Sequence, residues 1–201
     1  MSGKLRITAG AFKNRALKVP EGEAVRPTSE RARQAMFNRL EHSFQDYGFR
    51  LRRARVADLF AGTGALGLEA LSRGAAHVTF VEIARATHLK DNISALGVED
   101  KTTVLTLDAA ALPAAAQPYG LILMDAPYGV TTSPCGESLT QRAVDAVAAK
   151  GWLAEHGLIV AETGKDETLS APDGLEIEDV RGYGRGALTY LMRVRPALIR
   201  S

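Results

Sequence analysis

Residues 55–67, RVADLFAGTGALG, join a short apolar run to a glycine-rich loop. The run over residues 55–60 is typical of a buried β-strand, and the segment after the loop is typical of a helix. Gly62, Gly64 and Gly67 match the spacing G-x-G-x-x-G, which marks nucleotide-binding loops between a first strand and its helix. The stretch therefore predicts an open α/β sheet that binds a ligand at the carboxyl ends of its strands.

An acid beside this loop helps to choose between two classes of ligand. Asp58 lies four residues before Gly62. A dinucleotide places its pyrophosphate on backbone N–H groups at the start of a helix, where a neighbouring carboxylate brings no gain. S-adenosylmethionine has no phosphate and carries a cationic sulfonium and an ammonium group. The pattern favours S-adenosylmethionine, and an NAD-dependent oxidoreductase, which would leave Asp58 without a role, stays as an alternative.

Two more predicted strands end in acids. Glu82 follows residues 76–81 and lies twenty residues after Gly62, a position suited to binding both ribose hydroxyls. Asp108 follows residues 102–107, where it can accept a hydrogen bond from an adenine amino group. Because the carboxyl ends of parallel strands meet at one edge of a sheet, these acids and Asp58 predict a single cofactor site.

A further apolar run, residues 121–124, ends in a turn that suits an amino group on a planar ring. The Asp125 carboxylate and the Ala126 carbonyl would accept the two amine hydrogens, which aims the nitrogen lone pair at a methyl donor. Pro127 would stiffen the turn, and Tyr128 would stack on the ring. The segment resembles the (Asp/Asn)-Pro-Pro-(Tyr/Phe) motif of methyltransferases that act on exocyclic or amide nitrogens, and this resemblance implies direct methyl transfer to an exocyclic ring nitrogen.

The charge is divided unevenly along the chain. Residues 1–55 hold 13 Lys and Arg against 5 Asp and Glu, whereas the remaining residues are acidic on balance, and the formal net charge is +2. Basic and apolar residues alternate near the amino end, which predicts a short hairpin with a turn near Lys13 and Asn14. We expect this hairpin to bind a polyanion, and deletion of residues 1–18 to leave cofactor binding nearly intact.

Three segments resemble RsmD-type 16S ribosomal RNA (guanine-N2)-methyltransferases. Residues 58–75 are similar to the cofactor motif of that family, residues 5–17 to its opening hairpin, and residues 25–38 to its R-P-T segment. The match runs from about residue 4 to about residue 194. Three positions depart from the family pattern: Ala9 replaces a glycine, Gln34 a glutamate and Ala126 a proline.

The resemblance implies an activity and a set of contacts. It implies methyl transfer from S-adenosylmethionine to the N2 amino group of a guanine in small-subunit ribosomal RNA, within an assembled or assembling 30S particle, by a cytoplasmic monomer. The implied cofactor-binding residues are Asp58, Phe60, Gly62, Thr63, Gly64, Gly67, Glu82, Asp108 and Thr28. The implied RNA-binding residues are Lys4, Arg6, Lys13, Arg15, Lys18 and Arg26.

The predicted architecture is an α/β, doubly wound, mostly parallel seven-stranded sheet with helices on both faces and an amino-terminal hairpin. Residues 1–24 form the hairpin extension, 25–195 the methyltransferase domain and 196–201 a tail. A first helix follows Thr28, with Ala32, Ala35, Met36 and Leu40 on one face and Arg31, Arg33 and Arg39 largely elsewhere. Further helices are expected near residues 65–72, 84–96 and 140–150 and from Ala109, and residues 175–181 and 187–194 form a closing antiparallel hairpin.

Composition excludes several other classes. A lone cysteine, Cys135, cannot form a disulfide framework, and the four histidines show no metal-ligand spacing. No apolar run approaches the roughly 20 residues of a membrane span, so we expect no membrane contact. Adenine-N6 methylation of DNA or RNA, and RNA binding without catalysis, stay as alternatives.

Overall fold

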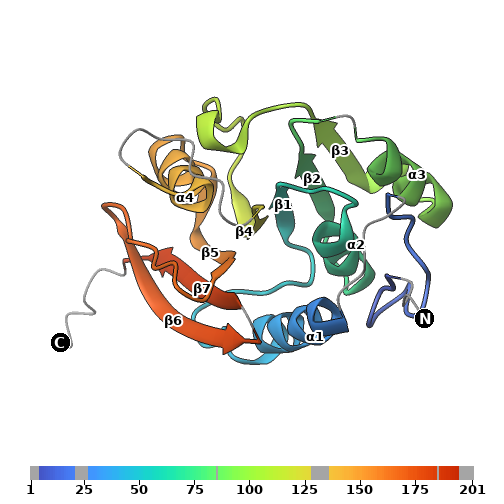
Figure 1. Ribbon diagram of the computed structural model, residues 1–201, viewed down its shortest axis with the longest axis horizontal. Coiled ribbons are helices and arrows are strands. Elements are labelled where there is room, and N and C mark those ends of the chain that lie inside the picture. The colour runs from blue at the N-terminus through green and yellow to red at the C-terminus, as the bar shows by residue number, and fades with distance from the viewer. Residues whose placement is uncertain (1–4, 21–26, 85, 128–135, 185, 195–201) are drawn as a thin grey trace.

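The computed structural model describes residues 5–20, 27–84, 86–127, 136–184 and 186–194, and it contains one seven-stranded sheet (Figure 1). The strands lie in the order β3-β2-β1-β4-β5-β7-β6. The five strands from β3 to β5 are parallel, and β7 runs antiparallel to both β5 and β6. The strands are β1 Arg55–Leu59, β2 His77–Val81, β3 Thr102–Leu105, β4 Tyr119–Asp125, β5 Leu153–Gly164, β6 Leu175–Tyr183 and β7 Gly186–Arg193.

Helices cover both faces of this sheet, as predicted. Because side chains alternate along a strand, Val56 of β1 packs in one core with Leu68, and Leu59 packs in the other core with Val144. The first face is covered by α1 Pro27–His42, α2 Ala65–Ser72 and α3 Thr87–Leu96, and the second by α4 Leu139–Ala149. The fold is therefore a doubly wound, Rossmann-like sheet with an antiparallel edge.

The strand order reverses between β1 and β4. From β1 the chain passes through α2 to β2 on one side, and it later returns to place β4 on the other side of β1. At such a switch point the connections leave in opposite directions and open a crevice at the carboxyl ends of the strands. This topology places the glycine-rich loop after β1 and the turn after β4 at the same edge.

The alanine-rich segment after β3 is not the helix that the sequence suggested. Only a 3₁₀ turn, η2, forms over Ala109–Ala111, and Leu112 is already extended, with φ −63° and ψ 140°. Pro113 follows directly, and a residue that precedes proline is disfavoured in the α conformation. A second 3₁₀ turn, η1, spans Glu99–Lys101 between α3 and β3.

The amino-terminal segment is a tight loop rather than a regular hairpin. One β-bridge joins Arg6 to Ala16, and the Leu17 N–H donates to the Leu5 carbonyl at 2.8 Å. At the tip, the backbone lies directly against the end of α2. A Cβ atom on Gly10 would lie 1.9 Å from the carbonyl oxygen of Ser72, so only glycine fits there.

Helix α1 corrects the prediction for one arginine. Ala32, Met36 and Leu40 are buried as expected, but Arg33 is also on the buried side, with only 5% of its surface exposed. Its partners are described below. Across the described part of the chain, no helix has the length and apolarity that crossing a membrane requires.

Candidate cofactor and substrate site

The glycine-rich loop turns sharply at the end of β1. Phe60, the first residue after the strand, has φ 64°, a left-handed conformation that is rare outside glycine. The loop is closed by two backbone bonds, from the Ala61 N–H to the Val81 carbonyl at 3.1 Å and from the Gly64 N–H to the Ala61 carbonyl at 2.7 Å. A Cβ on Gly62 would meet only the Phe60 carbonyl, at 4.0 Å, so this side of the loop faces open space.

The third glycine lets α2 pack closely on the sheet. A Cβ on Gly67 would lie 2.3 Å from Cε1 of Phe80 and 2.7 Å from Cγ1 of Val78. Real side chains never approach this closely, so a larger residue would push α2 away from β2. The three glycines thus hold the start of α2 beside the carboxyl ends of the strands, in the way that the G-x-G-x-x-G spacing predicts.

Asp58 lies beneath the loop. Its side chain is buried, and Oδ2 accepts a hydrogen bond from the Gly67 N–H at 2.8 Å. Burial raises the pKa of Asp58 well above its ordinary value, and the carboxylates of Asp125 and Glu82 act in the same direction. The structure therefore gives Asp58 a role in holding the first turn of α2. Its attraction for a cationic ligand stays a prediction, and the raised pKa weakens that attraction.

Glu82 and Asp108 lie just past the ends of their strands, as the sequence predicts. One carboxylate oxygen of Glu82 accepts from the Gly62 N–H at 2.8 Å, and the other accepts from the Ala84 N–H at 3.0 Å. Asp108 accepts from the Ala110 N–H at 2.8 Å. Both acids are half-buried. Glu82 therefore links the end of β2 to the open side of the glycine loop.

Asp125 ends β4 at the same edge. It is exposed, it pairs in register with Glu162 of β5, and the neighbouring Ala126 is buried. Pro127 is exposed, whereas Tyr128 lies outside the described residues. The side chains of Asp125 and Glu162 line a pocket of about 180 Å³ together with Thr63 of the glycine loop. The remaining lining residues are Leu5, Ala32, Arg33, Met36, Ala65, Leu66 and Leu188.

The predicted RNA-binding residues are spread over the amino-terminal segment. Arg6, Lys13, Arg15 and Lys18 are all exposed. Arg6 donates to the Asn14 carbonyl at 2.7 Å and Arg15 to the Ala95 carbonyl at 2.7 Å, while Lys18 forms an ion pair with Asp91 at 2.9 Å. Lys4, Arg26 and the side chain of Thr28 lie outside the described residues. In the described ranges, no group of His, Cys, Asp and Glu is placed to hold a metal ion.

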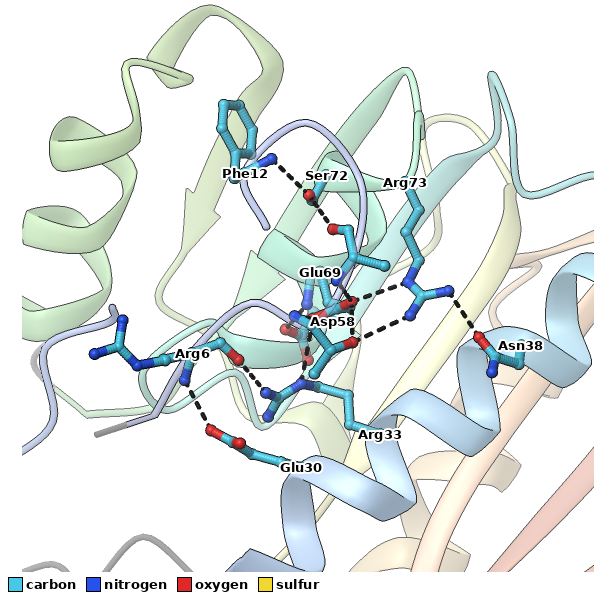
Figure 2. Close-up of polar contacts among 12 residues, drawn as sticks. Arg6, Phe12, Glu30, Arg33, Asn38, Asp58, Glu69, Ser72 and Arg73 are labelled. Atoms are coloured by element: carbon cyan, nitrogen blue, oxygen red, sulfur yellow. Dashed lines mark hydrogen bonds and ion pairs between the residues drawn. The ribbon is translucent and has the colours of Figure 1, made fainter. Parts of the chain in front are cut away.

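A buried ionic cluster on α2 was missed by the sequence reasoning (Figure 2). Glu69 has no exposed surface. Its two oxygens accept from the Thr8 N–H at 2.8 Å, the Thr8 hydroxyl at 2.6 Å and the Ala9 N–H at 3.1 Å. It also forms ion pairs with Arg73 at 2.9 Å and with Arg33 at 3.4 Å.

The two arginines extend this cluster to α1 and to the amino-terminal segment. Arg73 binds the Glu41 carboxylate at 2.8 Å and the Asn38 side chain at 3.2 Å, and Arg33 donates to the Arg6 carbonyl. The only signal in the sequence was the spacing of Glu69 and Arg73, which is four residues and places them on one helix face. Their partners lie up to sixty-five residues away.

Comparison with known proteins agrees with the geometry of this site. The family described as "Conserved hypothetical protein 95" matches residues 5–192. The chain is 33% identical over 186 residues to "Ribosomal RNA small subunit methyltransferase D" of Escherichia coli K12. This alignment covers 90% of this chain and 87% of that protein.

Two further similarities agree with that match. The protein with the same name from Haemophilus influenzae is 32% identical, over 85% of this chain and 84% of its own length. The solved structure titled "Putative methyltransferase yhhF from Escherichia coli" superposes with a TM-score of 0.74 at 29% identity, and the alignment covers 95% of this chain and 98% of that one.

Proposed function

Because this chain belongs to the RsmD family of ribosomal RNA methyltransferases, we propose that it transfers a methyl group from S-adenosylmethionine to the N2 amino group of a guanine in small-subunit ribosomal RNA. The observation that carries the proposal is the position of Asp125. This exposed carboxylate ends β4 and lines the same pocket as Thr63 of the glycine loop. An acceptor for an amine and a loop suited to the methyl donor are thus adjacent.

The residues around the loop fit S-adenosylmethionine chemically. Glu82 can bind the ribose hydroxyls, since its carboxylate already lies against the open side of Gly62. Asp108 can accept from the adenine amino group. When bound, the cofactor supplies a methyl group that a sulfonium has already activated.

Asp125 and the Ala126 carbonyl would orient the target nitrogen. The lone pair of a ring amine is delocalised, which makes the nitrogen a poor nucleophile. Hydrogen bonds from both N–H groups to these two acceptors would favour a pyramidal nitrogen and direct its lone pair. Tyr128 would stack on the base, which must leave its helix to enter the site. The alanine at position 126 keeps the carbonyl that this step requires.

The basic amino-terminal segment would bind the RNA backbone. Arg6, Lys13, Arg15 and Lys18 present exposed cations, and the hydrogen bonds of Arg6 and Arg15 to carbonyl groups leave their charge uncancelled. Phosphate contacts of this kind give affinity without reading sequence, so the choice of nucleotide must come from the base pocket. We propose the small ribosomal subunit as the substrate, because both relatives are named "Ribosomal RNA small subunit methyltransferase D".

Methyl transfer in vitro tests this function directly. The purified protein is incubated with methyl-labelled S-adenosylmethionine and small subunits from cells that lack this enzyme, and the RNA is digested to nucleosides. We expect label in N2-methylguanosine. Label in N6-methyladenosine would support the adenine alternative, and binding of NAD with no methyl transfer would support the oxidoreductase. A parallel reaction with protein-free RNA shows whether the assembled particle is required.

A further inference from the structure

We infer that Arg52 and Arg53 bind a backbone phosphate of the RNA in a pocket at the edge of the sheet opposite to the glycine loop. This inference rests on the proposed function, because it takes ribosomal RNA as the ligand. The pocket has a volume of about 530 Å³. Three parts of the chain form its wall: the tip of the amino-terminal segment at Gly10, the end of α2 at Ser72, and the two arginines just before β1.

Backbone hydrogen bonds fix this pocket at the amino ends of the strands. The Arg53 N–H donates to the Gly74 carbonyl at 2.8 Å, and the Ala76 N–H donates to the Ala54 carbonyl at 2.9 Å. The chain before β1 thus lies against the turn between α2 and β2. Because β1 and β2 are parallel, their carboxyl ends and the glycine loop lie at the other edge. The five residues of β1, about 16 Å in length, separate the two places, so a ligand in this pocket does not displace the cofactor.

The pocket carries positive charge that the protein itself does not neutralise. Arg73 and Glu41 line it too, but they form an ion pair with each other at 2.8 Å. Arg52 and Arg53 are exposed, and within the described ranges neither guanidinium has a hydrogen bond or an ion pair. Cγ of Arg52 lies 3.5 Å from the position of a Cβ on Gly74, so this side chain runs along the pocket wall. Two cations are therefore available to a ligand.

A nucleic-acid backbone fits this pocket better than a base or a small anion. The planar guanidinium of arginine matches the oxygens of a phosphate and binds two of them at once. The volume of about 530 Å³ equals that of roughly eighteen water molecules, which exceeds one phosphate and leaves room for a sugar. Among the described residues, no aromatic side chain lines the pocket to stack on a base. The contact is therefore with phosphate and sugar, which positions an RNA without reading its sequence.

The pocket is continuous with the basic amino-terminal segment. The Ala11 N–H donates to the Ser72 carbonyl at 2.8 Å, and the Phe12 N–H donates to the Ser72 hydroxyl at 2.9 Å (Figure 2). These bonds hold the tip against the end of α2, and the exposed Lys13 follows directly. An RNA strand on Lys13 reaches the two arginines by crossing the tip. A substrate that occupies both this pocket and the base site must span at least the length of β1, which a folded RNA does and a free nucleotide does not.

The salt dependence of RNA binding tests this pocket. The variants are Arg52→Gln, Arg53→Gln and the double variant, with Lys150→Gln, at an exposed cation at the end of α4, as the control for one lost charge. Filter binding to small-subunit ribosomal RNA is measured at several salt concentrations. Each single variant should reduce the slope of log affinity against log salt by about one, and the double variant by about two. The double variant Arg52→Lys with Arg53→Lys keeps both charges and should restore most of the slope.

Methyl-transfer kinetics separate a positioning contact from a role in the chemistry. With small subunits as substrate, the double glutamine variant should raise the KM for the subunit about tenfold, the scale of lost charge-assisted contacts, and leave kcat within about twofold. Calorimetry with S-adenosylhomocysteine should give the wild-type affinity, because the glycine loop lies at the other edge of the sheet. Circular dichroism of each variant checks that the fold is kept.

Three results would overturn the inference. The first is a wild-type slope in all the glutamine variants, which would make the two arginines a solvated surface. The second is weaker binding to small subunits with unchanged binding to protein-free RNA, which would assign the pocket to a ribosomal protein. The third is a fall in kcat with no change in KM. If the wild-type protein methylates no small subunit but the slopes still change as expected, the proposed function fails and the RNA pocket stands.

Discussion

Glu69 of α2 accepts a hydrogen bond from the backbone N–H of Thr8 at 2.8 Å, although the two residues are sixty-one positions apart. Through Arg33 and Arg73 the same carboxylate also holds α1 and the end of α2 (Figure 2). The amino-terminal segment is thus bonded to the helix that follows the glycine loop. The domain boundary at residue 24 stays a prediction. Removal of residues 1–18 should nevertheless destabilise the whole fold, because the Glu69 carboxylate would lose three hydrogen-bond donors.

The variant Glu69→Gln should destabilise the protein strongly. The amide keeps the shape but removes the charge, so Arg33 and Arg73 stay buried without their shared anion. Loss of one partner of a buried ion pair costs about 3–5 kcal/mol. Urea unfolding monitored by circular dichroism measures the change. Glu99→Gln, at an exposed acid of η1, is the control and should change the free energy of unfolding by less than about 0.5 kcal/mol. A similarly small effect at Glu69 would contradict the role of the cluster.

Asp58 should make the free energy of unfolding decrease as the pH rises. Its pKa in the folded protein is raised above the ordinary value of 3.8. At a pH between 3.8 and this raised pKa, the folded state therefore keeps a proton that the unfolded state has lost. The free energy of unfolding should therefore fall as pH rises through this window, by about 1.4 kcal/mol per pH unit for one proton.

The variant Asp58→Asn tests this directly. Asparagine can still accept from the Gly67 N–H but does not ionise. Relative to the wild type, it should gain stability as pH rises above about 4, and the difference should level off above the folded pKa. Urea unfolding is measured over a pH series, with Asp100→Asn at an exposed position as the control. A difference that does not change with pH would show that Asp58 is not held protonated by its burial.

Glu82→Ala should weaken S-adenosylmethionine binding by about 1.5–3 kcal/mol, because it removes charge-assisted hydrogen bonds to the ribose. It also frees the N–H groups of Gly62 and Ala84, so part of the loss comes from the loop itself. Glu82→Gln keeps an acceptor for the loop and should lose less. Calorimetry on both folded variants measures the effect. Wild-type affinity in Glu82→Ala would mean that the ribose binds elsewhere.

Asp125→Ala should reduce turnover by about two orders of magnitude or more, the loss expected when one preorganised polar partner is removed from a transition state. Binding of S-adenosylmethionine should change much less than turnover, because Glu82 and the glycine loop hold its nucleoside part. Asp125→Asn keeps one acceptor and should retain part of the activity. Single-turnover methyl transfer to small subunits, together with cofactor calorimetry, separates the two effects. Near-normal turnover in Asp125→Ala would place the chemistry elsewhere.

Lys13→Ala should weaken RNA binding about equally for all sequences. Lys13 is exposed at the tip of the amino-terminal segment, and loss of one phosphate contact should reduce the slope of log affinity against log salt by about one. Lys150→Ala, at the exposed end of α4, is the charge-matched control. Filter binding at several salt concentrations gives the slopes. If both variants give the wild-type slope, Lys13 is only a solvated surface charge.

Much of the fold follows from local patterns. The apolar run before Gly62, the glycine spacing, and Gly97 at the end of α3 each describe a local structure, and strands and helices formed there as predicted. The helix expected from Ala109 failed because alanine content favours a helix only where the backbone can continue, and Pro113 prevents that. Glu82, Asp108 and Asp125 could be placed because each directly follows an apolar run, and parallel strands end together.

The order of strands and helices, the glycine loop and the acids at the strand ends can be predicted from the sequence, because each depends on residues that are close along the chain. The folded structure is needed to show that Arg33 is buried, that Glu69 joins three segments, and that Asp125 shares a pocket with Thr63. Charged residues are usually on the surface, and an isolated sequence does not show which of them have a distant partner. Burial of these charges becomes favourable only when the fold brings the partners together.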